Sequence, residues 1–348
     1  MTQYQLALAA LRERPRRWLV TGAAGFIGSN LVEALLAANQ SVVGLDNFAT
    51  GRRGNLDLAI TAAGQSEGAG KRIEFVEGDI RSAEVCRIAC RDVEIVLHQA
   101  AQVSVPASVQ DPSTTHEINV TGFLNVLEAS RQAGVKRIVY ASSCAVYGDS
   151  ANLPLSEAEP ARPLSPYAAS KLANEDDAAA HAPSAGITSM GLRYFNVFGP
   201  RQDPKGVYAA VIPLWISTML QHQAVRIFGD GSSSRDFCPV ANVVQANLLA
   251  ATTGLAPGAH EVINVALGSR TSLNELFEAI RARLEPEFPH LRDLQPVYEP
   301  FRPGDIRHSH ARIDKAQNML GYSPSLSVEQ GLTETIKWFR QSASPKTN

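Results

Sequence analysis

Two side chains in the segment SPYAASKLANE are suited to proton transfer. Tyr167 and Lys171 are four residues apart, and on a helix this spacing puts both side chains on one face. A phenol has an ordinary pKa of about 10, and a nearby ammonium favours its phenolate form. The pair is therefore a plausible base and base-tuner, although an exposed surface pair is the commoner meaning of this spacing taken alone.

Two serines place hydroxyl groups close to the same chemistry. Ser142 and Ser143 end the apolar segment RIVYASS, which we expect to be a strand. Ligands of open α/β sheets bind at the carboxyl edge of the strands. A hydroxyl at that edge can hydrogen-bond the reacting oxygen of a substrate, so we predict Ser143, Tyr167 and Lys171 as the catalytic residues.

A glycine-rich segment predicts the dinucleotide site. TGAAGFIG follows an apolar segment and begins a helical one, and it contains Gly22, Gly25 and Gly28. Gly22 permits a tight turn, Gly25 lets backbone N–H groups approach a pyrophosphate, and Gly28 lets the helix pack closely on the strand. The helix that begins with Phe26 and Ile27 would direct its positive dipole end at the phosphates.

Asp46 indicates which dinucleotide binds. It closes the second predicted strand, SVVGLD, and its neighbours Asn47 and Phe48 are neutral. A carboxylate at this place binds the adenosine ribose diol and repels a ribose phosphate. The sequence therefore favours NAD, whose nicotinamide would have to lie against Tyr167 for the pair with Lys171 to act.

The elements that must position these groups follow a regular alternation. Helical segments at 25–38, 113–133 and 166–182 separate apolar segments that are rich in Val, Ile and Leu and lack strict alternation. Such strands have both faces covered, as in a parallel sheet wrapped by helices. The fold class that we predict is α/β, a doubly wound parallel sheet (Rossmann) with a smaller C-terminal α/β domain. The strands are expected at 17–22, 41–46, 72–79, 93–98, 137–143 and 187–195.

The chain divides into two predicted domains. Residues 1–190, with an N-terminal helix at 3–14, would bind NAD, and the Gly-rich segment 61–71 within them reads as an exposed loop. Residues 191–340 carry shorter elements punctuated by Pro and Gly, which suggests a substrate domain with some elements returning to the first sheet. The tail, 341–348, is expected to be disordered.

Composition excludes several classes of protein. The 348 residues are 45% hydrophobic and 19% charged, with a formal net charge of −2, which suggests neither a nucleic-acid nor a membrane partner. No apolar run is long enough to span a bilayer, and the N-terminus lacks the layout of a secretory signal, so we expect a soluble, cytoplasmic protein with reduced thiols.

The spacing of Cys86 and Cys90 has no second pair to complete a metal site, and none is expected. The cluster formed by Arg12, Arg14, Arg16 and Arg17 is interpreted as a solvated face.

Taken together, these residues resemble the nucleotide-sugar epimerase and dehydratase branch of the extended short-chain dehydrogenases. The resemblance covers roughly residues 16–340, and within the branch it is greatest to the bacterial UDP-N-acetylglucosamine 4-epimerases. It is specific because several separated segments match in the family's order: TGAAGFIGSNL, LDNFATG, EGDIR, LHQAA, YASSCAVYGD, SPYAASK, LRYFNVFGPRQDP and SRDFCPVANV.

The resemblance adds roles to further residues. Asn119 matches a residue behind the catalytic tyrosine. The wall around the adenosine and pyrophosphate is matched by Asp79, Ile80, Gln99, Ala100 and Ala101, and the positions that bind the nucleotide diphosphate and uridine by Asn196, Arg235, Arg302 and Asp305. An arginine can grip a phosphate through two hydrogen bonds, which supports Arg235 and Arg302 on chemical grounds.

The sugar pocket that the resemblance implies has small residues. Ser309 matches a gate position, and Ala210, followed by Val211, matches another position on the pocket; both leave room for an N-acetyl group. The pocket candidates also include Gln202, Ser142 and Ser104. Two departures from the closest subgroup bear on it, because Cys144 replaces a serine and Val103 replaces a glycine.

The function that the resemblance implies is NAD-dependent 4-epimerisation of UDP-N-acetylglucosamine and UDP-N-acetylgalactosamine through a transient 4-keto sugar, with NAD retained. Alternatives are epimerisation of UDP-glucose and UDP-galactose or of UDP-hexuronic acids, a nucleotide-sugar 4,6-dehydratase, and a non-catalytic NAD-binding regulator. A dehydratase usually has Asp-Glu after its catalytic threonine, whereas Cys144 and Ala145 follow Ser143 here. A homodimer is expected, and a role in polysaccharide biosynthesis is suggested by analogy alone.

Overall fold

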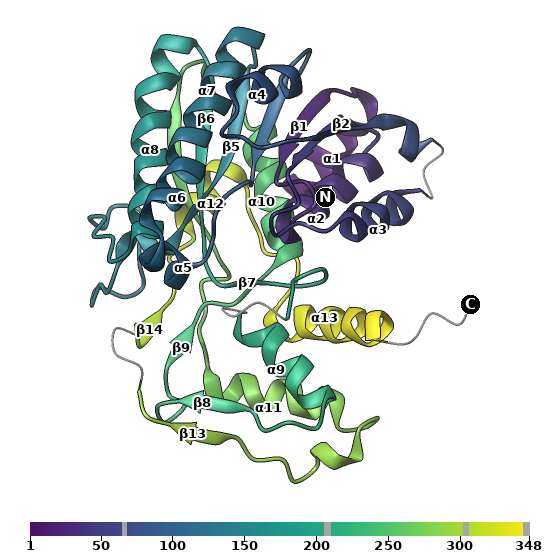
Figure 1. Cartoon of the computed structure of the whole chain (residues 1–348), viewed down its shortest axis with the longest axis vertical. Coiled ribbons are helices and arrows are strands. Elements are labelled where there is room, and N and C mark those ends of the chain that lie inside the picture. The colour runs from purple at the N-terminus through teal and green to yellow at the C-terminus, as the bar shows by residue number, and fades with distance from the viewer. Residues whose placement is uncertain (65–67, 205–209, 302–305, 344–348) are drawn as a thin grey trace.

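The computed structural model describes residues 1–64, 68–204, 210–301 and 306–343. Its centre is a parallel sheet of seven strands, which confirms the predicted doubly wound fold (Figure 1). The strand order is β11 (His260–Val265), β6 (Thr188–Tyr194), β5 (Arg137–Ser143), β4 (Ile95–His98), β1 (Arg17–Thr21), β2 (Ser41–Asp46) and β3 (Ile73–Glu77).

Both faces of the sheet are covered by helices, which explains why the strands are apolar without alternation. In β1, Trp18 and Val20 enter one hydrophobic core while Leu19 enters the other. Four helices supply most of the first core, namely α1 (Gln3–Glu13), α2 (Phe26–Ala37), α3 (Arg53–Ala63) and α10 (Val240–Thr252), with α12 (Asp314–Leu320) at its border. The second core is closed by α4 (Ala83–Ala89), α7 (Gly122–Ala133) and α8 (Pro166–Ala185).

The helix predicted at 113–133 is not a uniform α-helix. It consists of α6 (Pro112–His116), a π-helical turn η2 (Glu117–Thr121) and α7. A π turn accommodates one extra residue and is common near functional sites. Here it carries Asn119 into the interior, where the side chain is 1% exposed.

Three smaller predictions were wrong about element boundaries. The segment 61–71 is not simply a loop, because α3 continues to Ala63 and a 3-10 turn η1 (Ala69–Arg72) follows. The third strand ends at Glu77, so Asp79 lies in the loop beyond it. The N-terminal helix ends at Glu13, and position 14 is its C-cap.

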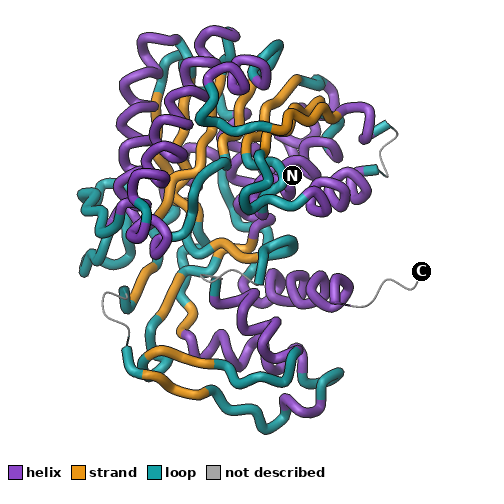
Figure 2. Tube along the Cα trace, viewed as in Figure 1, coloured by secondary structure: helices purple, strands orange, loops and turns teal. Residues whose placement is uncertain are grey.

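The smaller lobe lies below the sheet in the view of Figures 1 and 2 and is built from short strand pairs and helices around its own hydrophobic core. Position 190 falls within β6, and β11 returns to the main sheet; we propose that the first domain extends through β6. The strand groups are β7 (Val197–Phe198) with β10 (Cys238–Pro239), β8 (Arg226–Phe228) with β13 (Val297–Glu299), and β9 (Ser234–Arg235) with β12 (Thr271–Ser272) and β14 (His308–Ser309). The main helices are α9 (Val211–Leu220), α11 (Leu273–Leu284) and α13 (Val328–Ala343).

The remaining short helices are α5 (Val105–Gln110), η3 (Cys144–Tyr147) and η4 (Pro289–Leu291). Across the ranges that the structure describes, no helix is both long and apolar enough to cross a bilayer. Helices α7 and α8 pack side by side on one face of the sheet, and their use as a dimer interface stays a prediction. The predicted disordered tail begins inside α13, which ends at Ala343, and its last residues, 344–348, lie outside the described residues.

Replacing Gly28 should destabilise the fold. A Cβ atom at this position would lie 2.0 Å from the carbonyl oxygen of Gly22, which is backbone and cannot move aside. We expect Gly28→Ala to lower the free energy of unfolding by about 3 kcal/mol in urea titrations. Gly54→Ala is the control, because nothing lies within 4 Å of its added Cβ and alanine is favoured in a helix by about 0.5–1 kcal/mol. Equal stability of the two variants would contradict close packing at Gly28.

Candidate active site at the carboxyl edge of the sheet

The strand order reverses between β1 and β4, and the loops that follow these two strands meet at this point. The amide of Gly22 donates to the carbonyl of Leu45 at 2.8 Å, and its φ of +66° is a left-handed conformation that favours glycine. A Cβ on Gly22 would lie 2.9 Å from the nitrogen of Ala100. The backbone amides of Gln99 and Ala100 donate to the Thr21 hydroxyl at 3.2 Å. The glycine turn and the Gln99–Ala101 loop therefore form one continuous wall, at the place where open sheets of this type bind ligands.

The first turn of α2 is available for a phosphate. Gly25 is the N-cap and makes no side-chain capping bond. The helix begins with Phe26, Ile27 and Gly28, and their N–H groups have no intrahelical acceptor. An uncapped N-terminus of a twelve-residue helix attracts an anion through these donors and the helix dipole.

Asp46 is a buried carboxylate without a cation. Its side chain is 8% exposed and accepts hydrogen bonds from the amides of Ala24 at 2.9 Å and Phe48 at 2.8 Å. Among the described residues no lysine, arginine or histidine forms an ion pair with it. Each carboxylate oxygen still has lone pairs to accept from hydroxyl donors. The residue therefore fits a ribose diol, which supports its assignment to NAD.

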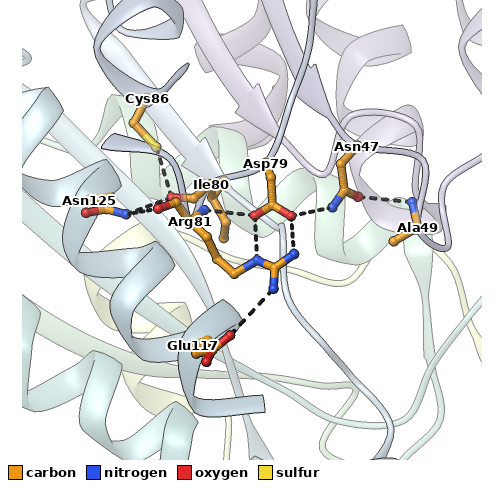
Figure 3. A network of polar contacts seen from close by, with 8 residues as sticks. All are labelled: Asn47, Ala49, Asp79, Ile80, Arg81, Cys86, Glu117 and Asn125. Atoms are coloured by element: carbon orange, nitrogen blue, oxygen red, sulfur yellow. Dashed lines mark hydrogen bonds and ion pairs between the residues drawn. The ribbon is translucent and has the colours of Figure 1, made fainter. Parts of the chain in front are cut away.

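Asn47, the residue after Asp46 in the chain, belongs to a polar network with Asp79 and Arg81 (Figure 3). The amide of Asn47 donates to Asp79 at 2.9 Å, and Arg81 donates to both oxygens of the same carboxylate. The Arg81 guanidinium lowers the pKa of Asp79 to about 2. Arg81 also reaches Glu117 in η2, with 3.6 Å between the charged atoms. The predicted residues Asn47 and Asp79 are thus brought together, with the Asp79 carboxylate already held by Arg81.

Two residues of the predicted wall contribute through backbone and packing. The side chain of Ile80 is 5% exposed and lies against Gly122 of α7. The side-chain amide of Gln99 donates to Asn247 at 3.3 Å and accepts from the hydroxyl of Tyr194 at 3.2 Å. Because the side chains of Ile80 and Gln99 contact other residues of the protein, they hold the loops after β3 and β4 in place.

The predicted catalytic residues meet at the end of β5. Tyr167 is the second residue of α8, and Ser143 is the hydrogen-bonding neighbour that lowers the pKa of its phenol. Lys171 is 2% exposed and donates to the carbonyl of Ala141 at 2.9 Å. The helical spacing therefore places the three residues as expected.

Burial is the largest influence on the two titratable groups of this site. It raises the pKa of Tyr167 to about 12, and a hydrogen bond with Ser143 opposes the rise. That the Lys171 ammonium favours the phenolate stays a prediction. Burial also lowers the pKa of Lys171 to about 8. The interior thus disfavours both charged forms, because neither group has an ionic partner there.

The loop that carries Val103 and Ser104 is attached to α8 at two points. Asn119 accepts from the amide of Gln102 at 2.7 Å and donates to the hydroxyl of Ser170 at 2.9 Å. The backbone amide of Tyr167 donates to Ser108 at 3.1 Å. Ser104 is the N-cap of α5 and Val103 is 63% exposed. These contacts bring the predicted pocket loop to Tyr167 and assign Asn119 a positioning contact.

Ser142 does not join the catalytic group. Its hydroxyl donates to Glu175 at 2.5 Å, and Glu175 forms a two-point ion pair with Arg193 at 2.9 and 2.6 Å. Arg193 lies over the ring of Tyr147 at 4.6 Å. Successive strand residues face opposite sides, so Ser142 faces this buried network while Ser143 faces Tyr167. Sequence reasoning missed Glu175, although it lies four residues after Lys171 on the same helical face.

Two predicted substrate residues, Asn196 and Arg235, lie close to the thiol of a third, Cys144. Burial raises the pKa of Cys144 to about 11, and the Arg235 charge and a backbone hydrogen bond from Asn196 oppose this shift. The side chain of Asn196 donates to the carbonyl of Asp236 at 3.2 Å. Cys144 therefore lies between the catalytic edge and the smaller lobe.

Arg235 and Ser309 are neighbours through strand pairing. They are opposite each other in the β9–β14 ladder. The guanidinium of Arg235 donates to the carbonyls of Ser234 and Arg307, both at 3.0 Å, and to that of Ile306. Ser309 is 8% exposed. The two residues are brought together, and the arginine is held against the backbone of its own lobe.

The other described pocket candidates, Gln202, Ala210 and Val211, precede or begin helix α9. Gln202 donates to the carbonyl of Val197 at 3.2 Å, while its side-chain oxygen is buried and accepts no hydrogen bond from the described residues. Ala210 is the exposed N-cap of α9, and Val211 begins that helix. The predicted residues Arg302 and Asp305 lie outside the described residues.

The family of the chain follows from its sequence. Residues 18–266 match the model of the NAD dependent epimerase/dehydratase family. The chain belongs to this family. The resemblance to the epimerase and dehydratase branch, and NAD as the cofactor, are therefore confirmed.

Three relatives illustrate how much of this epimerase/dehydratase chain is shared. A protein of Methanocaldococcus jannaschii named as a putative UDP-glucose 4-epimerase is 39% identical over 324 residues, which are 92% of this chain and 98% of that one. The structure of UDP-N-acetylglucosamine 4-epimerase from Methanobrevibacter ruminantium in complex with UDP-N-acetylmuramic acid has a TM-score of 0.85 at 37% identity, covering 94% and 99%. The UDP-glucose 4-epimerase of Thermus thermophilus, complexed with NAD, has a TM-score of 0.80 at 36% identity, covering 93% and 99%.

Cys86 and Cys90 of this epimerase/dehydratase are buried, and each thiol contacts a neighbour in the protein interior. In the described ranges no group of three or more His, Cys, Asp or Glu residues is arranged to hold a metal ion. Cys86 donates to the carbonyl of Ile80 at 3.3 Å, and Cys90 lies 3.7 Å from the hydroxyl of Ser130. Burial raises the pKa of these thiols to about 12 and about 11, so both remain protonated at neutral pH.

Lys171→Met should stabilise the dinucleotide-free protein at neutral pH. The ordinary lysine pKa of 10.5 falls to about 8 in the fold, so the folded state binds fewer protons than the unfolded state between these pH values. The penalty for the buried charge is full below pH 8, on the order of 3 kcal/mol, and it disappears as the pH rises towards 10.5.

The measurement is urea unfolding of dinucleotide-free wild type and variant at several pH values. We expect Lys171→Met to be more stable at pH 7 and the two curves to converge above about pH 10. Lys136→Met, at an exposed position, is the control and should show no such convergence. A Lys171→Met protein that is less stable at pH 7 would contradict an unpaired buried ammonium.

Proposed function

We propose that this chain is a UDP-sugar 4-epimerase that interconverts UDP-N-acetylglucosamine and UDP-N-acetylgalactosamine. One observation carries the proposal: Tyr167, its hydrogen-bonding neighbour Ser143, and Lys171 one helical turn away lie at the same sheet edge as the glycine turn. A sugar held at this edge would present a hydroxyl to a phenol and a serine at once. That arrangement suits removal and return of a single proton.

Each residue has a distinct task in this proposal. Tyr167 accepts the proton of the sugar 4-hydroxyl, Ser143 hydrogen-bonds the same oxygen, and Lys171 stabilises the phenolate electrostatically. NAD, when bound, supplies the acceptor for the C4 hydride and a positively charged ring. The 4-keto sugar turns within the pocket before the reduction, so the net redox change is zero. The pKa of about 12 indicates that the protein's own residues leave Tyr167 protonated at neutral pH.

The 4,6-dehydratase alternative lacks its acid and base. Elimination requires a carboxyl pair, and the residues after Ser143 are Cys144 and Ala145, which begin η3. A pKa of about 11 keeps the Cys144 thiol protonated. Neither side chain can therefore supply the carboxylate of an elimination.

The choice of sugar rests on small side chains. Ser309 and Ala210 occupy the gate and pocket positions that the family resemblance assigns, and both leave volume for an acetamido group. The similar structure from Methanobrevibacter ruminantium is named as a UDP-N-acetylglucosamine 4-epimerase, which supports this substrate. The second candidate is UDP-glucose and UDP-galactose, favoured by the name of the Methanocaldococcus relative.

Tyr167→Phe should remove epimerisation. Loss of a positioned proton-transfer group costs about 10²–10⁴-fold in rate. The measurement is NMR of the sugar formed from UDP-N-acetylglucosamine by NAD-loaded enzyme without added cofactor. Tyr298→Phe is the control, since this tyrosine is 53% exposed in the smaller lobe. Undiminished turnover by Tyr167→Phe would remove the phenol from the chemistry and the proposal with it.

Ser309→Tyr should change the sugar preference. A bulky gate would exclude the acetamido group, so we expect turnover of UDP-N-acetylglucosamine to fall by at least about tenfold while UDP-glucose turnover stays near the wild-type value. Assays with UDP-N-acetylglucosamine, UDP-glucose, UDP-galactose and UDP-glucuronate compare wild type, Ser309→Ala and Ser309→Tyr. An equal loss with all four sugars would show that Ser309 does not select the substrate.

A further inference from the structure

A cavity of about 600 Å³ opens at the amino edge of the sheet, on the side opposite Ser143 and Tyr167. Its walls come from the C-terminal end of α1, the residues just before β4, β5 and β6, and the last turn of α10. Its volume lies within the range of about 300–1,000 Å³ that is typical of ligand pockets. None of the residues proposed for the catalytic site lines it.

The parallel register aligns the residues at this edge. The amide of Glu94 donates to the carbonyl of Arg17 at 2.9 Å, that of Lys136 to Glu94 at 3.0 Å, and that of Thr188 to Lys136 at 3.1 Å. The residues that immediately precede β4 and β5 are therefore backbone neighbours. Side chains far apart in the chain are held in one row by these hydrogen bonds.

The cavity is strongly cationic. Arg14, Arg16, Lys136 and Arg137 line it, and Glu94 is the one carboxylate among its lining residues. Within the part of the chain that the structure describes, none of the four cations forms an ion pair. Arg17 differs, because it is paired with Glu74 at 2.6 Å and does not line the cavity. Arg14 is exposed and Arg16 is half-buried, so both stay solvated, as predicted for the N-terminal arginine cluster, while they line this cavity.

The α10 terminus does not cancel this charge. The carbonyl groups at a helix C-terminus would repel an anion. Arg137 donates to two of them, to Ala250 at 2.9 Å and to Thr253 at 2.5 Å. Burial and the positive charge of Arg16 lower the pKa of Arg137, as expected where two guanidinium groups repel each other across one cavity. A bound anion would relieve this repulsion.

Helix α1 is a fixed wall of the cavity. A capping box of Thr2 and Gln5 begins it, and Leu11 is 3% exposed. The side chain of Gln40 donates to the carbonyl of Leu11 at 2.7 Å and accepts from the amide of Arg16 at 3.0 Å. The backbone that carries Arg14 and Arg16 is therefore held in place without a ligand.

We propose that this cavity binds a small molecule that carries a di- or triphosphate group, at a site separate from the dinucleotide and the sugar. Guanidinium groups bind phosphate oxygens through two parallel hydrogen bonds, and several of them around one cavity favour a multivalent anion over a single phosphate. The volume leaves room for a nucleoside beside the phosphates.

The test is calorimetric titration of NAD-loaded enzyme, saturated with UDP, with tripolyphosphate at a salt concentration of about 0.15 M, where contacts between exposed charges are screened. Under the proposed function, NAD and UDP fill the diphosphate positions of the catalytic site, so the heat reports another site. We expect saturable binding of one tripolyphosphate per chain. A parallel titration with ATP shows whether a nucleoside adds affinity.

Arg16→Gln/Lys136→Gln should weaken the binding by at least about tenfold, because two charge-assisted contacts are lost. Arg12→Gln/Arg91→Gln removes the same charge from positions that do not line the cavity and should bind like wild type. Both double variants keep Arg137 and its contacts with α10. Absence of saturable binding in wild type, or an equal loss in both double variants, would overturn the proposal.

Discussion

Helix α8 keeps polar side chains in the interior, and the geometry of the site depends on how their charges and donors are satisfied. Lys171 donates to the Ala141 carbonyl, Asn174 donates to the carbonyl of Asn119 at 2.7 Å, and Glu175 is paired with Arg193. Burying such groups is costly unless each finds a partner. The partners lie on β5, on η2 and on β6, so a rotation of α8 would break contacts with three elements at once. Tyr167 is held opposite Ser143 for this reason.

The sheet and the catalytic spacing could be predicted from the sequence because both follow from short-range rules. A glycine turn between a strand and a helix, a strand-end Asp46, and a tyrosine one turn before a lysine each have a local meaning. The orientation of Ser142 could not be predicted, since two adjacent strand residues face opposite sides and nothing in RIVYASS indicates which side is the site. The π turn could not be predicted either, because EINVT has the composition of an ordinary helical segment.

The smaller lobe was harder to predict because its contacts are not local. Arg235 meets Ser309 through strands of two residues, and the ladder joins segments more than seventy positions apart in the numbering. A strand of two residues is too short for hydrophobic periodicity to predict it. Family resemblance named these residues but could not show that the Arg235 guanidinium is bound to backbone carbonyls of its own lobe. The rise in the pKa of Tyr167 could not be predicted from the sequence, because burial depends on all of the residues around the phenol.

The π turn at Glu117–Thr121 has a consequence for how this chain tolerates change in length. Each residue of an α-helix advances the chain by about 100°, so loss of the one extra residue would turn α6 and α7 against each other by roughly that angle. Asn119 would then leave Gln102 and Ser170, and the carbonyl that receives Asn174 would point elsewhere. Substitutions in this stretch can be absorbed one side chain at a time, but a deletion changes the phase of every residue upstream. The number of residues here is therefore under a stricter constraint than their identity.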